Sequence, residues 1–440
     1  MIPDTIVAPA TPPGYGGVSV VRVSGSLSTK LTKQLCKRGS SFSHRRPTLS
    51  SVYNIAGNTL DDAVFTFFKA PFSYTGEDVL EISCHGNPII VDQVVSTICS
   101  FGARLADPGE FTKRAFLNGK LDLVQAESVS RLIESRSIEA ANINSKILSG
   151  SLSKKLNTIR GSVAGVLAEL EFEFDISENE SLIPNLIIKS HKTINNNILS
   201  CENLIASYVD GHLFNHGARV VIYGNPNVGK STLLNALLEK DRAITSHVPG
   251  TTRDTVEADI VLSGVPVTLI DTAGIRSASS GIESAGIERS YDEIKNADLL
   301  INVVTSERDV SAKTQTNNTV VVFNKADLAA PPKNLTDTIP VSALLGDGVA
   351  GLKKVITKKL ISKNTHHSDV VLTTRRQKTA ITDCKNSLSA SLKHLNEDAP
   401  ELEIVAFELR ESIDHIDALL GKTTVDDILN KVFSGFCVGK

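Results

Sequence analysis

The chain has 440 residues, which is more than one usual domain, so we expect two or three. A hydrophobic content of 41% and a charged content of 22% are typical of a soluble globular protein. The net charge of −3 excludes a global basic field, so any contact with nucleic acid must be local or supplied by a partner. No apolar run approaches the roughly 20 residues that a membrane span needs, and we expect no membrane partner.

Cysteine usage indicates the redox compartment. The six cysteines are scattered and include no C-x-x-C pair. This argues against a disulfide framework or a zinc site and predicts a reducing cytoplasm. An acid at Asp4, where a secretory signal would carry cations, favours the same location.

Residues 1–118 are predicted to form an α+β domain. Strand-like alternation occurs at residues 18–23, 63–68 and 79–84. In the last of these, every second residue is apolar, which predicts one buried face. The turn-rich residues 11–17 are followed by no lysine, so we interpret them as a structural loop or a ligand rim rather than a phosphate loop.

Helical periodicity replaces strands after this domain. Apolar residues at helical spacing predict two or three long amphipathic helices in residues 119–215, and helices return in residues 365–440. Between them, residues 216–364 alternate strands and helices, which predicts a mostly parallel α/β sheet. We therefore expect a multidomain α/β protein in which a Ras-like α/β domain is inserted into one helical domain.

A phosphate-binding loop opens the α/β domain. The sequence GNPNVGKST at residues 224–232 follows an apolar strand at 218–223 and precedes a helix. In this context G-x-x-x-x-G-K-[ST] cradles phosphates with backbone N–H groups and a helix N-terminus. Lys230 is expected to reach the β- and γ-phosphates, and the Ser231 hydroxyl to bind Mg²⁺.

Four further motifs indicate that the nucleotide is a guanine nucleotide. Asp271 begins D-T-A-G, which is expected to contact the Mg²⁺ shell and the γ-phosphate. Thr251 and Thr252 lie in a candidate switch segment. Asp327 ends N-K-A-D, and its carboxylate matches the N1–H and 2-amino donors of guanine, which adenine lacks. Ser342 begins S-A-L, where a backbone N–H can meet the guanine O6.

The position that should orient the attacking water lacks a suitable side chain. Ras-like GTPases carry glutamine directly after D-x-x-G, and this chain has Ile275 there. The nearest polar candidates are Arg276 and Glu283, of which Glu283 can also be a solvated acid at a helix start. Charge developing between the phosphates needs a cation, and Asn227 is a polar side chain that can help to hold a monovalent one.

Several long stretches resemble the tRNA modification GTPase family, MnmE/TrmE. They are residues 10–17 (ATPPGYGG), 74–78 (YTGED), 84–86 (CHG), 108–120 (PGEFTKRAFLNGK), 121–127 (LDLVQAE) and 436–440 (FCVGK). The resemblance covers essentially the whole chain. It implies an N-terminal folate-binding and dimerisation domain, a helical domain and an inserted G domain.

The resemblance also implies an activity and its partners. Family members, with a flavoprotein of the MnmG/GidA family, form 5-carboxymethylaminomethyluridine at the wobble position of certain tRNAs. A 5-formyl- or methylene-tetrahydrofolate supplies the one-carbon unit, and FAD is carried by the partner in a heterotetramer. The folate contacts carried over are Arg22, Glu81, Lys120 and Lys440. A carboxylate suits the donor edge of a pterin, and cations suit its glutamate tail.

The G domain resembles the potassium-dependent kind, which dimerises across its switch face. K⁺ there would stand where an arginine finger stands in other GTPases, held by Asn227, Ser246, Val248 and Thr251. Ser231 and Thr252 map to Mg²⁺, and Glu283 to the water-orienting acid. Together, motifs and resemblance predict these nucleotide contacts: Asn227, Val228, Gly229, Lys230, Ser231, Thr232, Ser246, His247, Val248, Pro249, Gly250, Thr251, Thr252, Asp271, Thr272, Ala273, Gly274, Asn324, Lys325, Asp327, Ser342, Ala343 and Leu344.

Cys437 lies fourth from the end of the sequence and has three interpretations. Prenylation is disfavoured, because Gly439 and Lys440 are not the expected residues and no basic run precedes them. The family suggests a thiol at the folate site that is catalytic in the modification. The alternative is a cysteine that simply packs at the terminus.

Two other functional classes compete with this interpretation. A ribosome-assembly GTPase would carry an RNA-binding domain with a basic face after the G domain, whereas residues 365–440 are helical and only mildly basic near Arg375 and Arg376. A nucleotide-stabilised scaffold with negligible turnover remains open because of Ile275.

Overall fold

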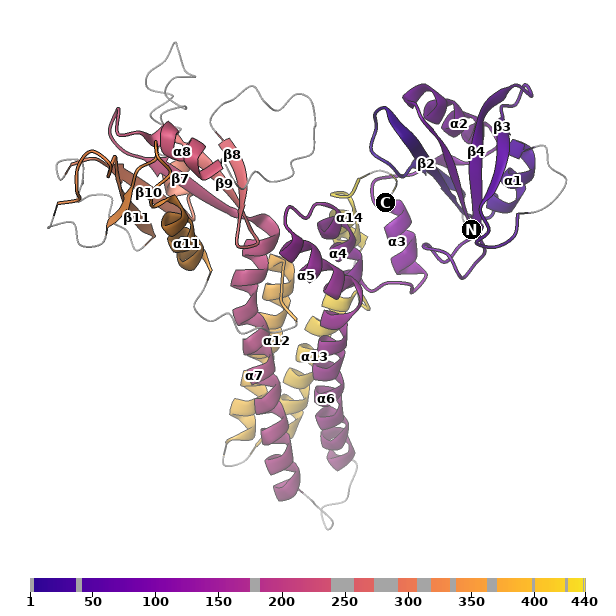
Figure 1. Cartoon of the computed structure of the whole chain (residues 1–440). Helices are drawn as coiled ribbons and strands as arrows, with labels where there is room; N and C mark the ends of the chain where they lie inside the picture. Colours follow the sequence, from indigo (N-terminus) through magenta and orange to yellow (C-terminus); the bar gives the residue numbers. More distant parts are fainter. Residues whose placement is uncertain are drawn as a thin grey trace. The chain divides into compact units, whose positions relative to one another are not determined.

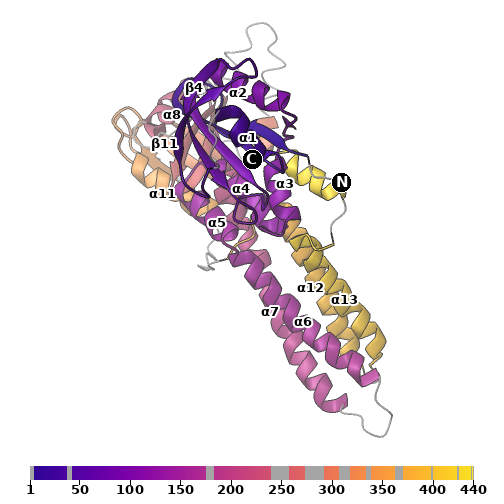
Figure 2. The same ribbon diagram turned by 90° about the vertical axis from the view of Figure 1, so that its right-hand side faces the viewer.

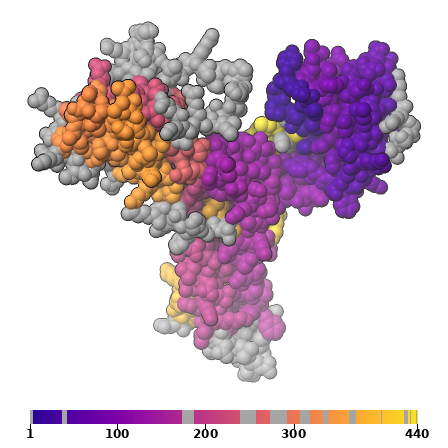
Figure 3. All heavy atoms as spheres, in the orientation of Figure 1, coloured from indigo at the N-terminus to yellow at the C-terminus, as the bar shows by residue number. Residues whose placement is uncertain are grey.

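The computed structural model describes the chain except for residues 1–3, 37–41, 175–182, 239–256, 273–291, 307–317, 333–337, 362–369, 398–399, 424–425, 438 and 440 (Figure 3). Packing divides the chain into two compact units. Unit 1 contains Met1–Ser130 and Asp417–Lys440, and unit 2 contains Arg131–Ile416. The first unit is therefore assembled from both ends of the sequence.

Unit 1 is built on a six-stranded sheet of order β3-β4-β5-β2-β1-β6 (Figure 1). Its strands are β1 (Ile6–Pro9), β2 (Gly16–Ser24), β3 (Thr48–Tyr53), β4 (Thr59–Phe68), β5 (Val79–Gly86) and β6 (Arg104–Leu105). Neighbours are antiparallel except for β1 and β6, which are parallel. The three strands predicted from alternation are confirmed as β2, β4 and β5.

Two helices bury one face of this sheet. They are α1 (Ser28–Cys36) and α2 (Pro88–Ser100), the latter capped by the Asn87 side chain on the Ile89 N–H. Leu80 and Ile82 of β5 lie in the shared core with Leu31 and Val94 of the helices. The helices α3 (Glu110–Leu117), α4 (Leu123–Ile133) and α14 (Asp426–Phe433) lie outside this core, and α14 contacts α3. The opposite face of β5 is left for polar residues.

The α/β part of unit 2 is a second six-stranded sheet of order β12-β11-β10-β7-β9-β8. Its strands are β7 (Ala218–Tyr223), β8 (Glu257–Leu262), β9 (Val265–Asp271), β10 (Leu299–Val304), β11 (Thr319–Asn324) and β12 (Thr338–Val341). All neighbours are parallel except β8 and β9. The helices α8 (Lys230–Leu238) and α11 (Val349–Leu360) share its core. The predicted mostly parallel sheet is confirmed, and β8 and β9 form its one antiparallel pair among the described strands.

The rest of unit 2 is helical. Its helices are α5 (Ile138–Leu148), α6 (Ser151–Phe174), α7 (Ile183–His216), α12 (Arg375–Leu395) and the first part of α13 (Leu402–Leu420). Figures 1 and 2 both show α7 and α12 side by side, and these helices pack along each other. Within the part of the chain that is described, no helix is both long and apolar enough to cross a membrane.

The α/β sheet is inserted between two packed helices. The chain leaves α7 at His216, enters β7, and returns to α12 through Leu372. A Cβ atom on Gly211 of α7 would lie 2.2 Å from the Leu372 carbonyl oxygen, so the returning segment crosses α7 where only glycine leaves room. The sequence predicted an α/β domain inserted between helical segments, and the packing of α7 on α12, which flank that domain in sequence, agrees with this prediction.

Candidate functional site

The phosphate-binding loop lies between the end of β7 and the start of α8. Two of its glycines are required by geometry. Gly224 has φ +153° and a Cβ there would lie 2.3 Å from the Val303 carbonyl oxygen; Gly229 has φ +91° and a Cβ would lie 2.4 Å from Asn324 Nδ2. These residues let the loop turn tightly against the sheet. Lys230 is the first residue of α8, and its buried ammonium donates to the Gly224 carbonyl at 3.0 Å.

The expected Mg²⁺ residues meet at the end of β9. Ser231 Oγ donates to Asp271 Oδ2 at 2.5 Å, and Asp271 is 2% exposed. The Thr272 hydroxyl donates to the Ile222 carbonyl at 3.1 Å, which fixes the end of β9 against β7. A hydroxyl and a carboxylate are hard oxygen ligands, and they fit the donor set of a Mg²⁺ that also binds phosphate.

The predicted guanine motifs brace the phosphate loop. Asn324 is 3% exposed; its Nδ2 donates to the Val228 carbonyl at 2.8 Å, and its Oδ1 accepts from the Ala343 N–H at 3.0 Å. One buried amide therefore joins three of the predicted segments. Lys325 Nζ donates to the Asn227 carbonyl at 3.0 Å. The sequence motif alone does not reveal these bracing bonds.

Asp327 and Leu344 lie on the exposed side of this arrangement. Asp327 is exposed beyond the end of β11, and Leu344 is 79% exposed, whereas Ser342 and Ala343 are buried. Ala326 N–H donates to the Val341 carbonyl at 3.2 Å, so the two loops are directly joined. Thr232, the last residue of the motif, is exposed on the first turn of α8.

Other predicted contacts lie outside the described residues. They are Ser246, His247, Val248, Pro249, Gly250, Thr251, Thr252, Ala273, Gly274, Glu283 and Lys440, together with Ile275 and Arg276. Of the four residues predicted for K⁺, the structure describes Asn227, which is exposed and has φ +63°. The roles of all these residues stay predictions.

In unit 1, two of the residues predicted for folate are paired with each other. Arg22 of β2 and Glu81 of β5 are register partners, and Arg22 Nε donates to Glu81 Oε1 at 2.9 Å. Their side chains are 17% and 27% exposed. The guanidinium also lies 5.5 Å from the Tyr74 ring centroid and 5.8 Å from that of Phe111. A cation, a carboxylate and aromatic rings side by side are groups that suit a pterin with a carboxylate tail.

Two further predicted residues lie elsewhere in unit 1. Lys120 follows α3, and its Nζ donates to the Pro71 carbonyl at 3.1 Å. Cys437 is an exposed free thiol after α14. Gly439 has φ +95°, and a Cβ there would lie 2.0 Å from the Pro9 carbonyl oxygen, so the C-terminal segment lies against the end of β1. The six cysteines, all among the described residues, form no disulfide.

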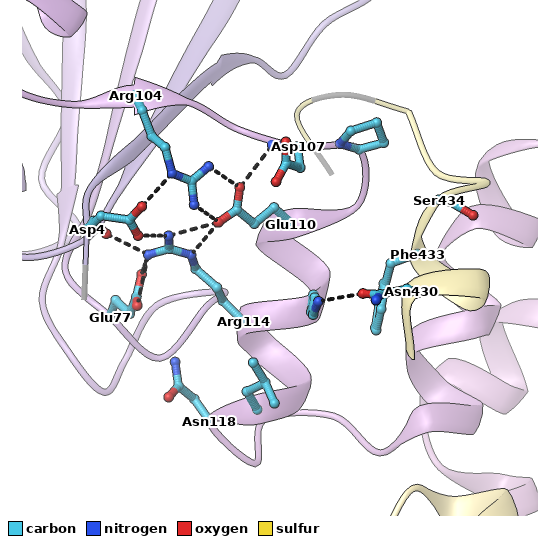
Figure 4. Close-up of a pocket in the computed structure, with 13 residues that line it drawn as sticks. Asp4, Glu77, Arg104, Asp107, Glu110, Arg114, Asn118, Asn430, Phe433 and Ser434 are labelled. Carbon is cyan, nitrogen blue, oxygen red and sulfur yellow. Dashed lines mark hydrogen bonds and ion pairs between the residues drawn. The ribbon is translucent and has the colours of Figure 1, made fainter. Parts of the chain in front are cut away.

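A charged cluster that the sequence analysis did not single out lines a cavity of about 700 Å³ (Figure 4). Arg114, only 10% exposed, donates to Asp4 at 2.7 Å, to Glu110 at 2.9 Å and to Glu77 at 3.2 Å. Arg104 pairs with Glu110 at 2.6 Å. Hydrogen bonds from Arg104 lower the pKa of Asp4. Burial alone would raise the pKa of Glu110, but hydrogen bonds from Arg104 and Arg114 outweigh it, and the pKa of Glu110 is lowered. The i,i+4 spacing of Glu110 and Arg114 was the available signal.

Comparison with known proteins decides the family. The model described as "GTP-binding protein TrmE N-terminus" matches residues 5–120, and that described as "MnmE helical domain" matches residues 123–437. The chain belongs to the MnmE family of tRNA modification GTPases. It is similar to the tRNA modification GTPase MnmE of Pseudothermotoga lettingae, with 37% identity over 100% of both chains, and to that of Moorella thermoacetica, with 36% identity over 100% of both. The Aquifex aeolicus protein of that name is 37% identical over 99% of this chain and 100% of its own.

Membership of the MnmE family agrees with the architecture. A TrmE-type N-terminal unit, a helical domain and an inserted P-loop G domain are all present. The chain is a GTPase. The predicted fold class and enzyme class are therefore confirmed.

Proposed function

We propose that this chain hydrolyses GTP to support the formation of 5-carboxymethylaminomethyluridine at the wobble position of certain tRNAs. The supporting observation is full-length similarity to proteins named tRNA modification GTPase MnmE, combined with a complete and braced phosphate loop. The proposal includes a flavoprotein partner of the MnmG/GidA family that carries FAD, and a location in the cytoplasm.

At the nucleotide site, each described residue has a physical role. Lys230, already inside the loop, would exchange its carbonyl partners for the β- and γ-phosphates and neutralise their charge. Ser231 would hold Mg²⁺ directly and Asp271 through water. The exposed Asp327 would accept the N1–H and 2-amino protons of guanine, which gives specificity against adenine. The bond from the Ala343 N–H to Asn324 would hold in place the loop that we propose to face the base.

Hydrolysis needs two further contributions. We propose that Glu283 orients the attacking water, since Ile275 has no polar group for this work. K⁺, held by Asn227 with Ser246, Val248 and Thr251, would supply the positive charge that an arginine finger supplies elsewhere. The exposed amide of Asn227 has the oxygen that such an ion needs. The G domains of two chains would meet across this face.

In unit 1, we propose that a tetrahydrofolate derivative binds on the face of the sheet that carries Arg22 and Glu81. Glu81 would bind the donor edge of the pterin, and Arg22, paired with Glu81, would hold that carboxylate in place beside the Tyr74 ring. Lys120 and Lys440 would add positive charge for the tail. The exposed thiol of Cys437 is proposed to act in the modification at this site.

Nucleoside analysis of tRNA from cells that lack the protein tests the tRNA role. We expect wobble uridines without the carboxymethylaminomethyl group, restored by the wild-type gene and not by a Lys230→Ala variant. Unchanged wobble uridines in the deletion strain would remove the tRNA role while leaving the GTPase activity standing.

Hydrolysis of GTP in KCl and in NaCl tests the role of the monovalent cation. We expect faster turnover in KCl, and loss of that stimulation in Asn227→Ala, because that change removes a ligand oxygen. Equal and negligible turnover in both salts would favour a nucleotide-stabilised scaffold.

A further inference from the structure

Arg219 of β7 pairs with two acids that come from different parts of the G domain. Its Nη2 donates to Glu293 Oε2 at 2.6 Å and to Glu257 Oε1 at 3.3 Å. One nitrogen atom holds both carboxylates, so the two like charges lie close together and depend on the cation between them. We call Arg219, Glu257 and Glu293 the Arg219 network.

The two acids directly follow the two segments that carry the predicted switch residues. Glu257 is the first residue of β8 and comes after residues 239–256, which include the predicted Mg²⁺-binding threonine. Glu293 is the second residue after residues 273–291, which include the predicted water-orienting acid. Both acids of the network are themselves described. Arg219 therefore joins the two points at which the chain returns to the sheet.

The backbone of Arg219 is fixed to the sheet independently of its side chain. Its N–H donates to Asp298 Oδ2 at 2.8 Å, and the Asp298 N–H donates to the Arg219 carbonyl at 2.9 Å. Asp298 directly precedes β10, which pairs with β7. The guanidinium thus starts from a rigid element, and it can act as an anchor for the two acids.

The elements that carry the two acids both contact β9 beside Asp271. Ile270 directly precedes Asp271 and is the register partner of Glu257. The segment that carries Glu293 packs on the same part of the sheet, with Ile294 and Ala297 against Val221, Ile270 and Leu300. A movement of either acid away from Arg219 would therefore disturb the end of β9 that carries Asp271.

Arg219 itself lies away from the expected nucleotide. In the register of β7 and β9, Arg219 is opposite Thr268, whereas Ile222 is opposite Asp271. Three residues along a strand correspond to about 10 Å. Because the guanidinium is also bound to two acids, its effect on hydrolysis must pass through other residues rather than through contact with GTP.

Stability of the fold does not by itself explain the network. The side chains of Arg219, Glu257 and Glu293 are 42%, 54% and 28% exposed. Ion pairs that are exposed to this extent contribute little to the free energy of unfolding. A planar guanidinium fork is, however, well suited to orient two carboxylates at once.

We propose that Arg219 is a positioning residue for GTP hydrolysis. It holds Glu257 and Glu293 together and thereby keeps the end of β9, with Asp271, in the position that suits Mg²⁺. The inference rests on the role proposed above for Asp271 at the metal. It does not depend on the proposed tRNA modification.

Steady-state GTP hydrolysis by the full-length chain tests the proposal. In Arg219→Gln at saturating Mg²⁺, we expect kcat to fall about fivefold and the KM for GTP to stay unchanged. The Mg²⁺ concentration that gives half of the maximal rate should rise several-fold. Arg219→Lys should return kcat to within about twofold of wild type, because it keeps the charge but lacks the planar fork.

A double-mutant cycle shows whether Arg219 acts through its acids. Glu293→Gln should lower kcat in the same way as Arg219→Gln. Because both changes break the same ion pair, the double variant should lose little more than either single variant. Fully multiplicative losses would show that Arg219 does not act through Glu293, and would contradict the proposal.

The matched control is Arg136→Gln. Arg136 is an exposed cation that pairs with Asp259 of the same strand, β8, at 3.6 Å, and its loss should leave kcat at the wild-type value. The midpoint of urea unfolding should be unchanged in all variants. If Arg219→Gln does not fold, Arg219→Lys and Glu293→Gln test the same expectation.

Three results would overturn the proposal. They are an unchanged kcat in Arg219→Gln, an equal loss in the Arg136→Gln control, and a raised KM for GTP with unchanged kcat. If Ser231→Ala lowers hydrolysis and Arg219→Gln does not, the proposed Mg²⁺ site stands and the positioning role of Arg219 alone is lost.

Discussion

The hydroxyl of Ser231 donates to Asp271 Oδ2 at 2.5 Å, which joins the start of α8 to the end of β9. The two residues are 40 positions apart in sequence and come from different motifs. Their contact shows that the phosphate loop and the D-T-A-G segment form one oxygen-rich corner. That corner is where Mg²⁺ would be bound together with the β- and γ-phosphates.

Replacing Ser231 tests this corner. Ser231→Ala removes the only direct Mg²⁺ ligand that the described part of the nucleotide site is expected to supply, and we expect Mg²⁺-dependent GTP hydrolysis to fall by about two orders of magnitude. Hydrolysis is measured as phosphate release against Mg²⁺ concentration. Thr357→Ala removes a hydroxyl that only bonds within α11, and it should keep full activity.

We expect the specificity for guanine to depend on Asp327. In Asp327→Asn the side chain offers a donor where guanine also offers one, so GTP affinity should fall by at least about 100-fold. Xanthine has a carbonyl at that position, and XTP should therefore bind better than GTP to the variant. Competition between the two nucleotides is the measurement. Retained preference for GTP would show that the base lies away from Asp327.

Asn324 should matter for stability as well as binding. Asn324→Ala removes two buried hydrogen bonds and leaves the Val228 carbonyl and Ala343 N–H without that partner. We expect a loss of about 2–3 kcal/mol in the free energy of unfolding of the G domain. Urea unfolding with tyrosine or circular dichroism detection measures it. The exposed Asn235 on α8 provides the control, since Asn235→Ala should change stability by less than about 0.5 kcal/mol.

The charged cluster in unit 1 predicts a pH dependence. Arg114→Met leaves Asp4, Glu77 and Glu110 with less positive charge, and should destabilise unit 1 by about 2 kcal/mol at pH 7, below the value for a fully buried pair because Asp4 is 54% exposed. Carboxyls with a lowered pKa stabilise the fold above their ordinary pKa, and this contribution is lost as pH falls through the lowered value.

The difference between wild type and Arg114→Met should therefore shrink below about pH 4. Thermal unfolding at several pH values measures it. Lys113→Met, on the same helix, removes a half-buried cation whose described hydrogen bond is to the exposed side chain of Asn430, and its effect should be small at every pH. A constant difference from pH 7 to pH 3 would contradict the assignment.

Local pattern predicted the strands and the phosphate loop well. Alternation in residues 79–84 depends on burial of one face, and the structure buries Leu80, Ile82 and Cys84 accordingly. The glycine and lysine positions of the loop follow from backbone geometry and charge, which are also local. In residues 119–215 the expected two or three long helices are two, α6 and α7, preceded by the short α4 and α5.

Pairings between distant residues could not be predicted from the residues themselves. The Arg22–Glu81 contact depends on the register of β2 against β5, and the Arg114 cluster unites Asp4, Glu77 and Glu110 from three separate segments. Single charges on strands are usually solvated, so nothing in their spacing indicates a shared site. The bracing role of Asn324 is hidden for the same reason.

The close contact between the Leu372 carbonyl and Gly211 of α7 has a consequence for engineering this chain. The chain leaves the packed pair of helices α7 and α12 and rejoins it at neighbouring points. We therefore expect that the inserted α/β domain can be deleted and that α7 and α12 can be joined by a short flexible linker.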